Sequence, residues 1–375
     1  MKKLLTAILL LSMSVAHAGN YAYQPDGRMS FEWNSNEAVE LFSTAGTIMK
    51  ATIVSVDDND KHWCNASGNG WAYASNVTFY CFAPYSLYHK LAQSPYTALP
   101  VTYTNQTQSA NGNTEHLAAV DYMAAQTAST DDALSIPYNH LGCIMRIAAY
   151  VPEGKTFSTL MLTTKDNTAW FAEEATINAT NNTITPTETT TTATLSLNNI
   201  TVASGDSLIT YLMLPPTDLT GKSLMLTATA KDGTTLQAYI EGCNMQAGKV
   251  CPVSVGKGNY FRASEDSGNT GGDDPQVLSL NLGFDEQYAP TDNQILIATT
   301  YAPDFNLDTE NTMKPFLLGD ANFDGTVDVT DVVLVVNHYQ ADTTRELDFN
   351  VCDINGDGVI DVTDVVGIVN IYQNK

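Results

Sequence analysis

The sequence predicts a mostly β protein, in which two tandem β-sandwich domains precede a small α-helical module. Short segments rich in β-branched and aromatic residues, such as 47–56 and 76–83, are broken by Gly, Asn and Pro. No helical period extends over any long stretch of residues 19–131. Many short strands with polar turns favour a sandwich or a barrel. Residues 320–364 hold two copies of one loop-and-helix pattern, which adds the helical part.

The first 18 residues have the features of a secretory signal peptide. Lys2 and Lys3 are followed by a largely apolar run over 4–15 and by Ala16-His17-Ala18, a small-x-small cleavage site. We therefore expect cleavage after Ala18 and a secreted or cell-surface protein. No cysteine lies near the cut, which argues against a lipid anchor. No later apolar run reaches the roughly 18–20 residues that span a bilayer.

The body is expected to contain one sandwich over residues 19–131 and a second over 132–262. The second unit has seven strand-like segments, which suits a sandwich of ordinary size. Within it, Leu224 and Leu226 alternate with Met225 and Thr227, the period of two that marks a half-buried strand.

An acidic, Gly-rich linker is predicted over residues 263–275. Residues 276–317 then hold two short strands, at 277–282 and 294–298, which are too few to form a core of their own. They either pack on the helical module or add to the edge of a sheet.

The C-terminal module, residues 318–375, carries two twelve-residue loops with oxygen-bearing side chains at positions 1, 3, 5, 9 and 12 and Gly at position 6. Calcium takes six to eight oxygen ligands, and such a loop supplies them, with a backbone carbonyl at position 7 and a water at position 9. We therefore predict two calcium ions. The candidate ligands are Asp320, Asn322, Asp324, Thr326, Asp328 and Asp331 in the first loop and Asp353, Asn355, Asp357, Val359, Asp361 and Asp364 in the second.

Two features distinguish this module from an ordinary EF-hand. Position 12 is Asp rather than Glu, and only the half after each loop is helical, at 329–339 and 362–372. In both respects residues 318–375 resemble a type I dockerin, an EF-hand-like calcium module. The resemblance implies two calcium ions, two helices and docking to a cohesin-like or surface scaffold protein. It places partner contacts at loop positions 10 and 11, which are Val329, Thr330, Val362 and Thr363 here.

The first helix of the module has an apolar surface on all sides, at Val332-Val333-Leu334-Val335-Val336. The second helix can cover only one face of it. The other face must meet either a partner protein or the preceding domain, because an uncovered stripe would be a large exposed patch for so small a module.

Charge and cysteine content limit the possible partners and compartments. Formal net charge is −24, and residues 264–375 hold 21 acidic and 3 basic residues. Nucleic acid and anionic lipid are poor partners for such a surface. Six cysteines in an exported chain permit disulfides. Cys243–Cys251 is the best local pairing and Cys64–Cys81 the next, with buried free thiols as the alternative.

The body resembles the fimbrillin-like surface proteins of Bacteroidetes. The stretches that carry this resemblance are 77–85, 121–125, 134–141, 211–215 and 246–250, within about 30–260. The resemblance implies two tandem β-sandwiches and a part in adhesion or pilus-like assembly, with fimbrial subunits or a glycan as partners of the β domains. Two features depart from the polymerising members, namely the missing lipobox cysteine and the added calcium module.

No constellation of residues predicts catalysis. The mature histidines lack metal-ligand spacing, and no nucleophile elbow, His-Glu-x-x-His or phosphate-binding loop occurs. The leading hypothesis is a non-enzymatic fimbrillin-type adhesin with a calcium-dependent docking module. The alternative is a carbohydrate-binding component of a dockerin-recruited, polysaccharide-degrading assembly, in which Trp63, Trp71 or Trp170 would stack on sugars instead of packing in the core. A secreted hydrolase without a visible motif is the third.

Overall fold

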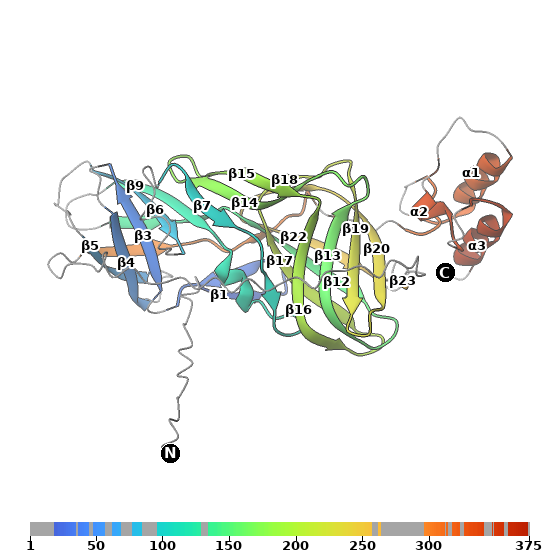
Figure 1. Ribbon diagram of the computed structural model, residues 1–375, viewed down its shortest axis with the longest axis horizontal. Helices are drawn as coiled ribbons and strands as arrows, with labels where there is room; N and C mark the ends of the chain where they lie inside the picture. The colour runs from blue at the N-terminus through green and yellow to red at the C-terminus, as the bar shows by residue number, and fades with distance from the viewer. Residues whose placement is uncertain are drawn as a thin grey trace, which may run out of the picture.

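The computed structural model gives the protein an elongated form, with strands along most of its length and the helices beyond one end (Figure 1). It describes residues 19–34, 37–44, 48–56, 62–68, 77–84, 96–128, 134–256, 262–263, 296–311, 313, 317–322, 326–340, 347, 349–355 and 359–373. Within these residues, no helix has the length and apolar character needed to cross a bilayer.

An eight-stranded sheet forms the N-terminal part of the body, in the order β10-β24-β5-β4-β3-β6-β9-β11. Its strands are β3 (Ala38–Ser43), β4 (Ile48–Val56), β5 (His62–Gly68), β6 (Thr78–Ala83), β9 (Met123–Ala128), β10 (Leu134–Pro137), β11 (Asn139–His140) and β24 (Leu296–Tyr301). Alternation sets its inner face: in β6, Phe79 and Cys81 are buried, whereas Thr78 and Tyr80 are half-buried. The hairpin of β1 (Asn20–Tyr23) and β2 (Met29–Glu32) precedes this sheet.

The C-terminal part of the body contains a four-stranded sheet, β17-β12-β22-β25, and a six-stranded sheet, β23-β20-β19-β13-β16-β8. Their strands are β8 (Thr107–Gln108), β12 (Cys143–Tyr150), β13 (Lys155–Thr164), β16 (Thr192–Val202), β17 (Ser207–Leu214), β19 (Ser223–Ala230), β20 (Thr235–Glu241), β22 (Lys249–Val255), β23 (Arg262–Ala263) and β25 (Asn306–Leu307). The predicted alternation in β19 is confirmed, because Leu224 and Leu226 are fully buried and Met225 is half-buried. Thr227 departs from it and is also buried.

Two smaller sheets complete the body. One has the order β15-β14-β7 and contains β7 (Leu99–Thr102), β14 (Phe171–Asn178) and β15 (Thr183–Thr190). The other pairs β18 (Thr217–Asp218) with β21 (Asn244–Met245). Buried side chains from both parts of the body form one continuous apolar cluster. The mostly β class predicted from the short strands is therefore confirmed, and the structure resolves it into several sheets.

Strands from before and after residue 131 share sheets. β10 and β11 belong to the N-terminal sheet through β24 and β9, while β7 and β8 pair with β14 and β16. After the linker the chain returns to the body. β24 lies between β10 and β5, and β25 pairs with β22. The described part of 276–317 thus joins the sheets of the body, and β24 lies inside a sheet instead of at its edge. The predicted strand 277–282 lies outside the described residues.

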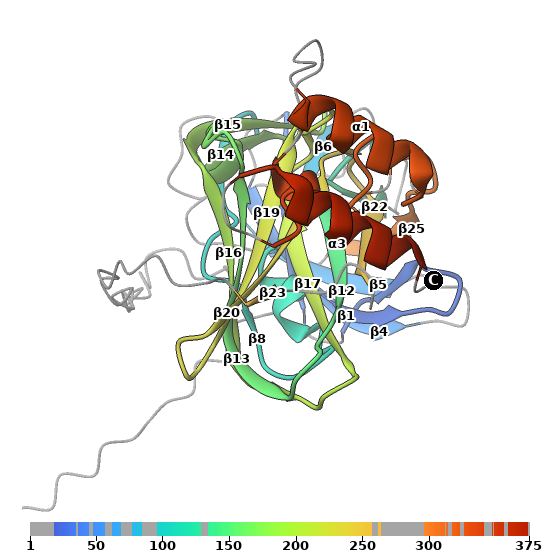
Figure 2. The same ribbon diagram turned by 90° about the vertical axis from the view of Figure 1, so that its right-hand side faces the viewer.

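The helical module has its own small core. Helices α1 (Val329–Tyr339) and α3 (Val362–Gln373) lie side by side (Figure 2), and the short α2 (Phe349–Cys352) lies near them (Figure 1). Both longer helices begin where the sequence predicts. Their core is separate from that of the body and consists of Ala321, Val327, Val335, Leu347, Val351, Cys352, Ile360 and Ile368.

Candidate metal centre and docking face

Each loop of the module closes on a fully buried aspartate at its twelfth position. Asp331 accepts hydrogen bonds from the backbone N–H of Asn322 (3.1 Å) and of Asp328 (2.8 Å). Asp364 repeats this pattern with the backbone N–H of Asn355 (3.4 Å) and of Asp361 (2.8 Å), and it also accepts from the backbone N–H of Ile354 (2.7 Å). In the described part of the two loops, the twelfth-position aspartate therefore accepts from equivalent backbone groups, as the sequence repeat predicts.

The same residues start the helices. Asp328 is the N-cap of α1 and accepts from the backbone N–H of Thr330 at 2.7 Å, while the Asp331 side chain accepts from the N-cap backbone. This is a capping box, and it satisfies N–H groups that have no partner inside the helix. In the second loop, hydrogen bonds from the hydroxyl and backbone N–H of Thr363 lower the pKa of Asp361.

The oxygen atoms of the loop residues suit a hard divalent cation as ligands. Asp320, Asp331 and Asp364 are buried acids. An oxygen-only set of carboxylate, amide and carbonyl groups fits calcium. Asp324 and Asp357 lie outside the described residues, and among the remaining ones no group of three His, Cys, Asp or Glu side chains converges on one point. The ligand set therefore stays a prediction.

Beside the loops, exposed valines occupy repeat-equivalent positions of α1 and α3, and we name these valines the candidate docking face. Val329 and Val333 are 58% and 50% exposed, and Val362 and Val366 are 53% and 54% exposed. Residues four apart share one face of a helix, so each helix presents one apolar pair. Of the stripe predicted to be apolar on all sides, Val335 is buried in the core of the module, while Val333 faces outward.

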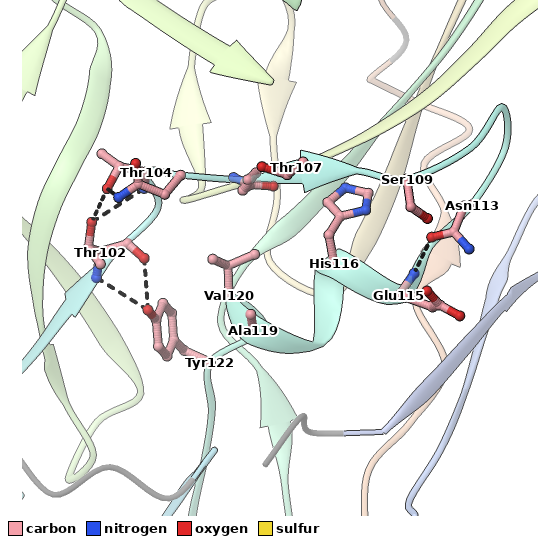
Figure 3. A pocket seen from close by; sticks show the side chains of 12 residues that line it. Thr102, Thr104, Thr107, Ser109, Asn113, Glu115, His116, Ala119, Val120 and Tyr122 are labelled. Carbon is pink, nitrogen blue, oxygen red and sulfur yellow. Dashed lines mark hydrogen bonds between the residues drawn. The ribbon is translucent and has the colours of Figure 1, made fainter. Parts of the chain in front are cut away.

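A polar pocket of about 450 Å³ lies in the body, between the β7–β8 segment and the 3₁₀ helix η2 (Glu115–Ala119) (Figure 3). The residues that line it are Thr102, Thr104, Asn105, Gln106, Thr107, Ser109, Asn113, Glu115, His116, Ala119, Val120 and Tyr122. His116 contacts the backbone carbonyl of Tyr211 through Nε2 (2.8 Å), and burial lowers the pKa of this imidazole. The sequence did not predict this pocket, because Thr, Asn, Gln and Ser residues are also typical of an ordinary solvated loop.

His140 and Trp170 are buried in the body and have hydrogen-bond partners there. His140 is buried, with Nδ1 2.7 Å from Asp121 Oδ2 and Nε2 2.6 Å from the carbonyl oxygen of Pro303. Trp170 is buried as well, and its indole N–H donates to the carbonyl oxygen of Thr191. The side chains of Trp63 and Trp71 lie outside the described residues.

The two disulfide predictions have different outcomes. The Sγ atoms of Cys243 and Cys251 lie 3.4 Å apart, both side chains are buried, and the two thiols are free in this structure. Cys64 on β5 and Cys81 on β6 are separated by β4 and β3 in the sheet. At about 4.8 Å per strand this separation exceeds the roughly 7 Å limit between the Cα atoms of a disulfide, so the Cys64–Cys81 prediction is wrong.

Family comparisons agree with both resemblances. Residues 25–258 match the model of the fimbrillin-like family. The chain belongs to that family. Residues 318–370 match the model of the type I dockerin domain, so the fimbrillin-like body carries a dockerin at its C-terminal side. No protein among the curated ones matches the chain.

Solved structures of proposed cell adhesion proteins from Bacteroides are similar to this fimbrillin-like chain. One from Bacteroides ovatus has 12% identity and a TM-score of 0.42, covering 66% of this chain and 94% of its own. One from Bacteroides thetaiotaomicron has 14% identity and a TM-score of 0.36, covering 60% and 81%. One from Bacteroides fragilis has 9% identity and a TM-score of 0.38, covering 69% and 92%. Because all three TM-scores lie below 0.5, the assignment depends on the family models.

Proposed function

We propose that this protein is an exported, non-enzymatic surface adhesin whose dockerin, with two calcium ions bound, attaches it to a cohesin-like or scaffold partner. The observation that carries the proposal is the pairing of exposed valines with buried loop-closing acids. Val329 and Val362 each lie two residues before the acid that ends a loop. Calcium that organises the loop therefore also sets the start of the helix that presents the docking face.

The docking face has two equivalent halves, one on α1 and one on α3, with the same residues at equivalent positions. A partner that recognises an exposed Val-Thr pair and the valine four residues later finds both copies on one module. We infer that such a partner recognises the module through apolar contacts with the valines and not through charge, although the residues around the valines are acidic. Desolvating the valines supplies the favourable free energy, and the adjacent threonine hydroxyls supply polar contacts at the rim.

Pull-down from the protein's own cell surface tests the proposal. Full-length protein is immobilised with calcium or with a chelator, and bound proteins are identified by mass spectrometry. The expected result is a cohesin-like or scaffold protein that is retained with calcium, released by chelator and lost when Val333 and Val366 are both changed to Asp. Equal retention by the double variant, or retention that ignores calcium, contradicts the proposal.

The polar pocket supports a second candidate function, that of a carbohydrate-binding component recruited through the same dockerin. Its lining offers hydroxyl and amide groups, with Glu115 as its one acidic side chain and no lysine or arginine. Such a lining suits a neutral, hydroxyl-rich ligand of the size of one or two sugar units. A glycan array with the wild-type protein and a Thr104→Leu variant tests it. Sugar hydrolysis in the same assay would instead support an enzyme.

A further inference from the structure

The residue that follows the predicted signal-peptide cut contacts a buried acid. The backbone nitrogen of Gly19 donates a hydrogen bond to Glu37 Oε1 at 2.5 Å, and Asn34 Nδ2 donates to the same oxygen at 2.7 Å. Glu37 is 5% exposed. Its second oxygen, Oε2, is buried and has no hydrogen-bond partner among the described residues. One half of this carboxylate is therefore satisfied by neutral donors and the other half is not.

A buried carboxylate of this kind normally has a cation beside it. No Lys, Arg or His forms an ion pair with Glu37 in the described part of the chain. Burial raises the pKa of Glu37 to about 7. The neighbouring titratable groups do not supply a cation, because Tyr21 donates to Asp121 (2.6 Å) and His140 contacts the same Asp121 oxygen.

Gly19 has a fixed place against the body. It has a φ of +82°, and a Cβ atom at this position would overlap the ring of Phe31 and lie 2.9 Å from the carbonyl oxygen of Glu32. Both of these groups belong to β2, so only glycine fits beside this strand. The nitrogen of Gly19 is held at the acid by the same packing.

We propose that removal of residues 1–18 leaves the α-ammonium of Gly19 in an ion pair with buried Glu37, which fastens β1 of the mature chain to the body. Hydrolysis of the Ala18–Gly19 peptide bond consumes one water, leaves a carboxylate on Ala18 and frees the Gly19 amine, which takes up a proton. The single amide N–H becomes three N–H donors. One keeps the bond to Oε1, and another can serve the unpartnered Oε2.

The raised pKa of Glu37 determines how the stability of the folded chain changes with pH. With an amide at Gly19, the raised pKa of Glu37 means that the folded chain holds a proton between about pH 4.3 and 7, so stability falls as the pH rises through this range. An α-ammonium favours the carboxylate and removes that loss. The advantage of the mature chain is therefore absent near pH 4, grows toward pH 7 and disappears when the ammonium loses its proton, above the usual ~8.

A comparison of two N-termini tests the ion pair. Full-length mature protein that begins at Gly19 is compared with the same protein carrying two extra residues ahead of Gly19, each with Glu37 or with Glu37→Gln. We expect the extension to lower the equilibrium constant for folding by about tenfold or more at pH 7, which corresponds to a pKa difference of one unit. Near pH 4 the extension should leave this constant unchanged. The Glu37→Gln pair should show no difference at either pH. Equal stability of the two Glu37 proteins, or an undiminished difference between the two Glu37→Gln proteins, overturns the proposal.

Amine reactivity gives a second readout that does not depend on unfolding. An amine-reactive ester at pH 7 labels an ordinary α-amine ahead of lysines because of its lower pKa. We expect the folded mature protein to be labelled at Gly19 at least tenfold more slowly than the urea-unfolded chain, and Glu37→Gln to restore much of the rate. Rapid labelling of the folded wild type, or a mass spectrum of the exported protein with a different first residue, overturns the proposal.

Discussion

Gln106 and Met213 are hydrogen-bonded as if they were residues of two paired strands. The side-chain amide of Gln106 accepts from the backbone N–H of Met213 at 2.9 Å and donates to its carbonyl oxygen at 2.7 Å. Gln108 accepts from the N–H of Tyr211 and donates to the carbonyl oxygen of Ile209. β17 is the edge strand of its sheet, so these side chains cover backbone groups that would otherwise accept a further strand.

Truncation of Gln106 should therefore destabilise the body. Gln106→Ala leaves one buried N–H and one buried C=O of Met213 without partners, at about 1–3 kcal/mol for each group. We expect a total loss of roughly 2–6 kcal/mol, seen as a lower urea midpoint with an unchanged slope. Thr107→Ala is the matched control, because this neighbouring side chain is exposed and its loss should change the midpoint little. A shift for Gln106→Ala no larger than that of the control would show that water replaces the side chain.

Oxidation should join Cys243 to Cys251. Their Sγ atoms lie 3.4 Å apart on either side of a short turn, so little backbone movement is needed to close the bond. Closing so short a loop is worth about 2.5 kcal/mol in the chain-entropy account. We expect non-reducing peptide mapping of the exported protein to find this bridge and reductant to lower the unfolding midpoint.

Cys143 supplies the control for the bridge. Burial raises the pKa of its thiol, and its Sγ contacts the carbonyl oxygen of Leu214 at 3.4 Å. Cys143→Ala should leave the effect of reductant in place, whereas Cys243→Ala should remove it. A mapped bridge between Cys143 and Cys243 would contradict the predicted pairing.

The helical module was predicted from sequence to within one residue at its helix ends, because its signals are local. Asp328 and Asp361 cap helices within the same twelve residues that form the loops, and the repeat confirms the pattern. The short α2 was missed, since four residues are too few for a helical period. The sequence thus predicts an element well where the residues that hydrogen-bond to one another lie within about a dozen positions.

The body was less predictable, because its decisive contacts are distant in the chain. The pattern of residues 294–298 indicates a strand but not its neighbours, which are β10 and β5. Period-two alternation shows which face of a strand is buried, yet it does not name the pairing strand. The burial of Gln106 and Glu37 was not predicted, since each has a partner distant in the chain, Met213 and Gly19 respectively, and polar residues in short loops are ordinarily solvated.

The two metal sites should be separable by substitution at position 12. Asp331→Ala removes a carboxylate from the first loop and leaves the N–H groups of Asn322 and Asp328 without their acceptor. We expect calorimetry to find two calcium ions per wild-type chain, one for Asp331→Ala, one for Asp364→Ala and none for the double variant. Glu310→Gln, an exposed acid outside the loops, should keep both.

Circular dichroism checks the same sites independently. Because the ion binds the folded loop, its binding free energy adds to the stability of the module. Calcium should increase the helical signal of the wild type and change that of the double variant little. Two bound ions in the double variant would show that position 12 is not a ligand.

The exposed valines should affect partner binding without affecting calcium. Val333 and Val366 lie on the solvent side of α1 and α3, four residues after Val329 and Val362. A charge at Val333 stays in water in the free protein, so Val333→Asp should change the unfolding free energy by less than about 0.5 kcal/mol. In a complex the same charge would be buried without a partner, which costs several kcal/mol.

The partner can bind either through the valines of α1 or through those of α3 if it recognises both halves of the docking face. Val333→Asp and Val366→Asp alone should then each weaken binding of the calcium-loaded protein modestly, and the double variant should lose it by a hundredfold or more in surface plasmon resonance. Calorimetry on the same proteins should still find two calcium ions. Val335→Asp is the contrasting variant, because Val335 is fully buried and its replacement should unfold the module. A single exposed-face variant that abolishes binding would assign the partner to that helix alone.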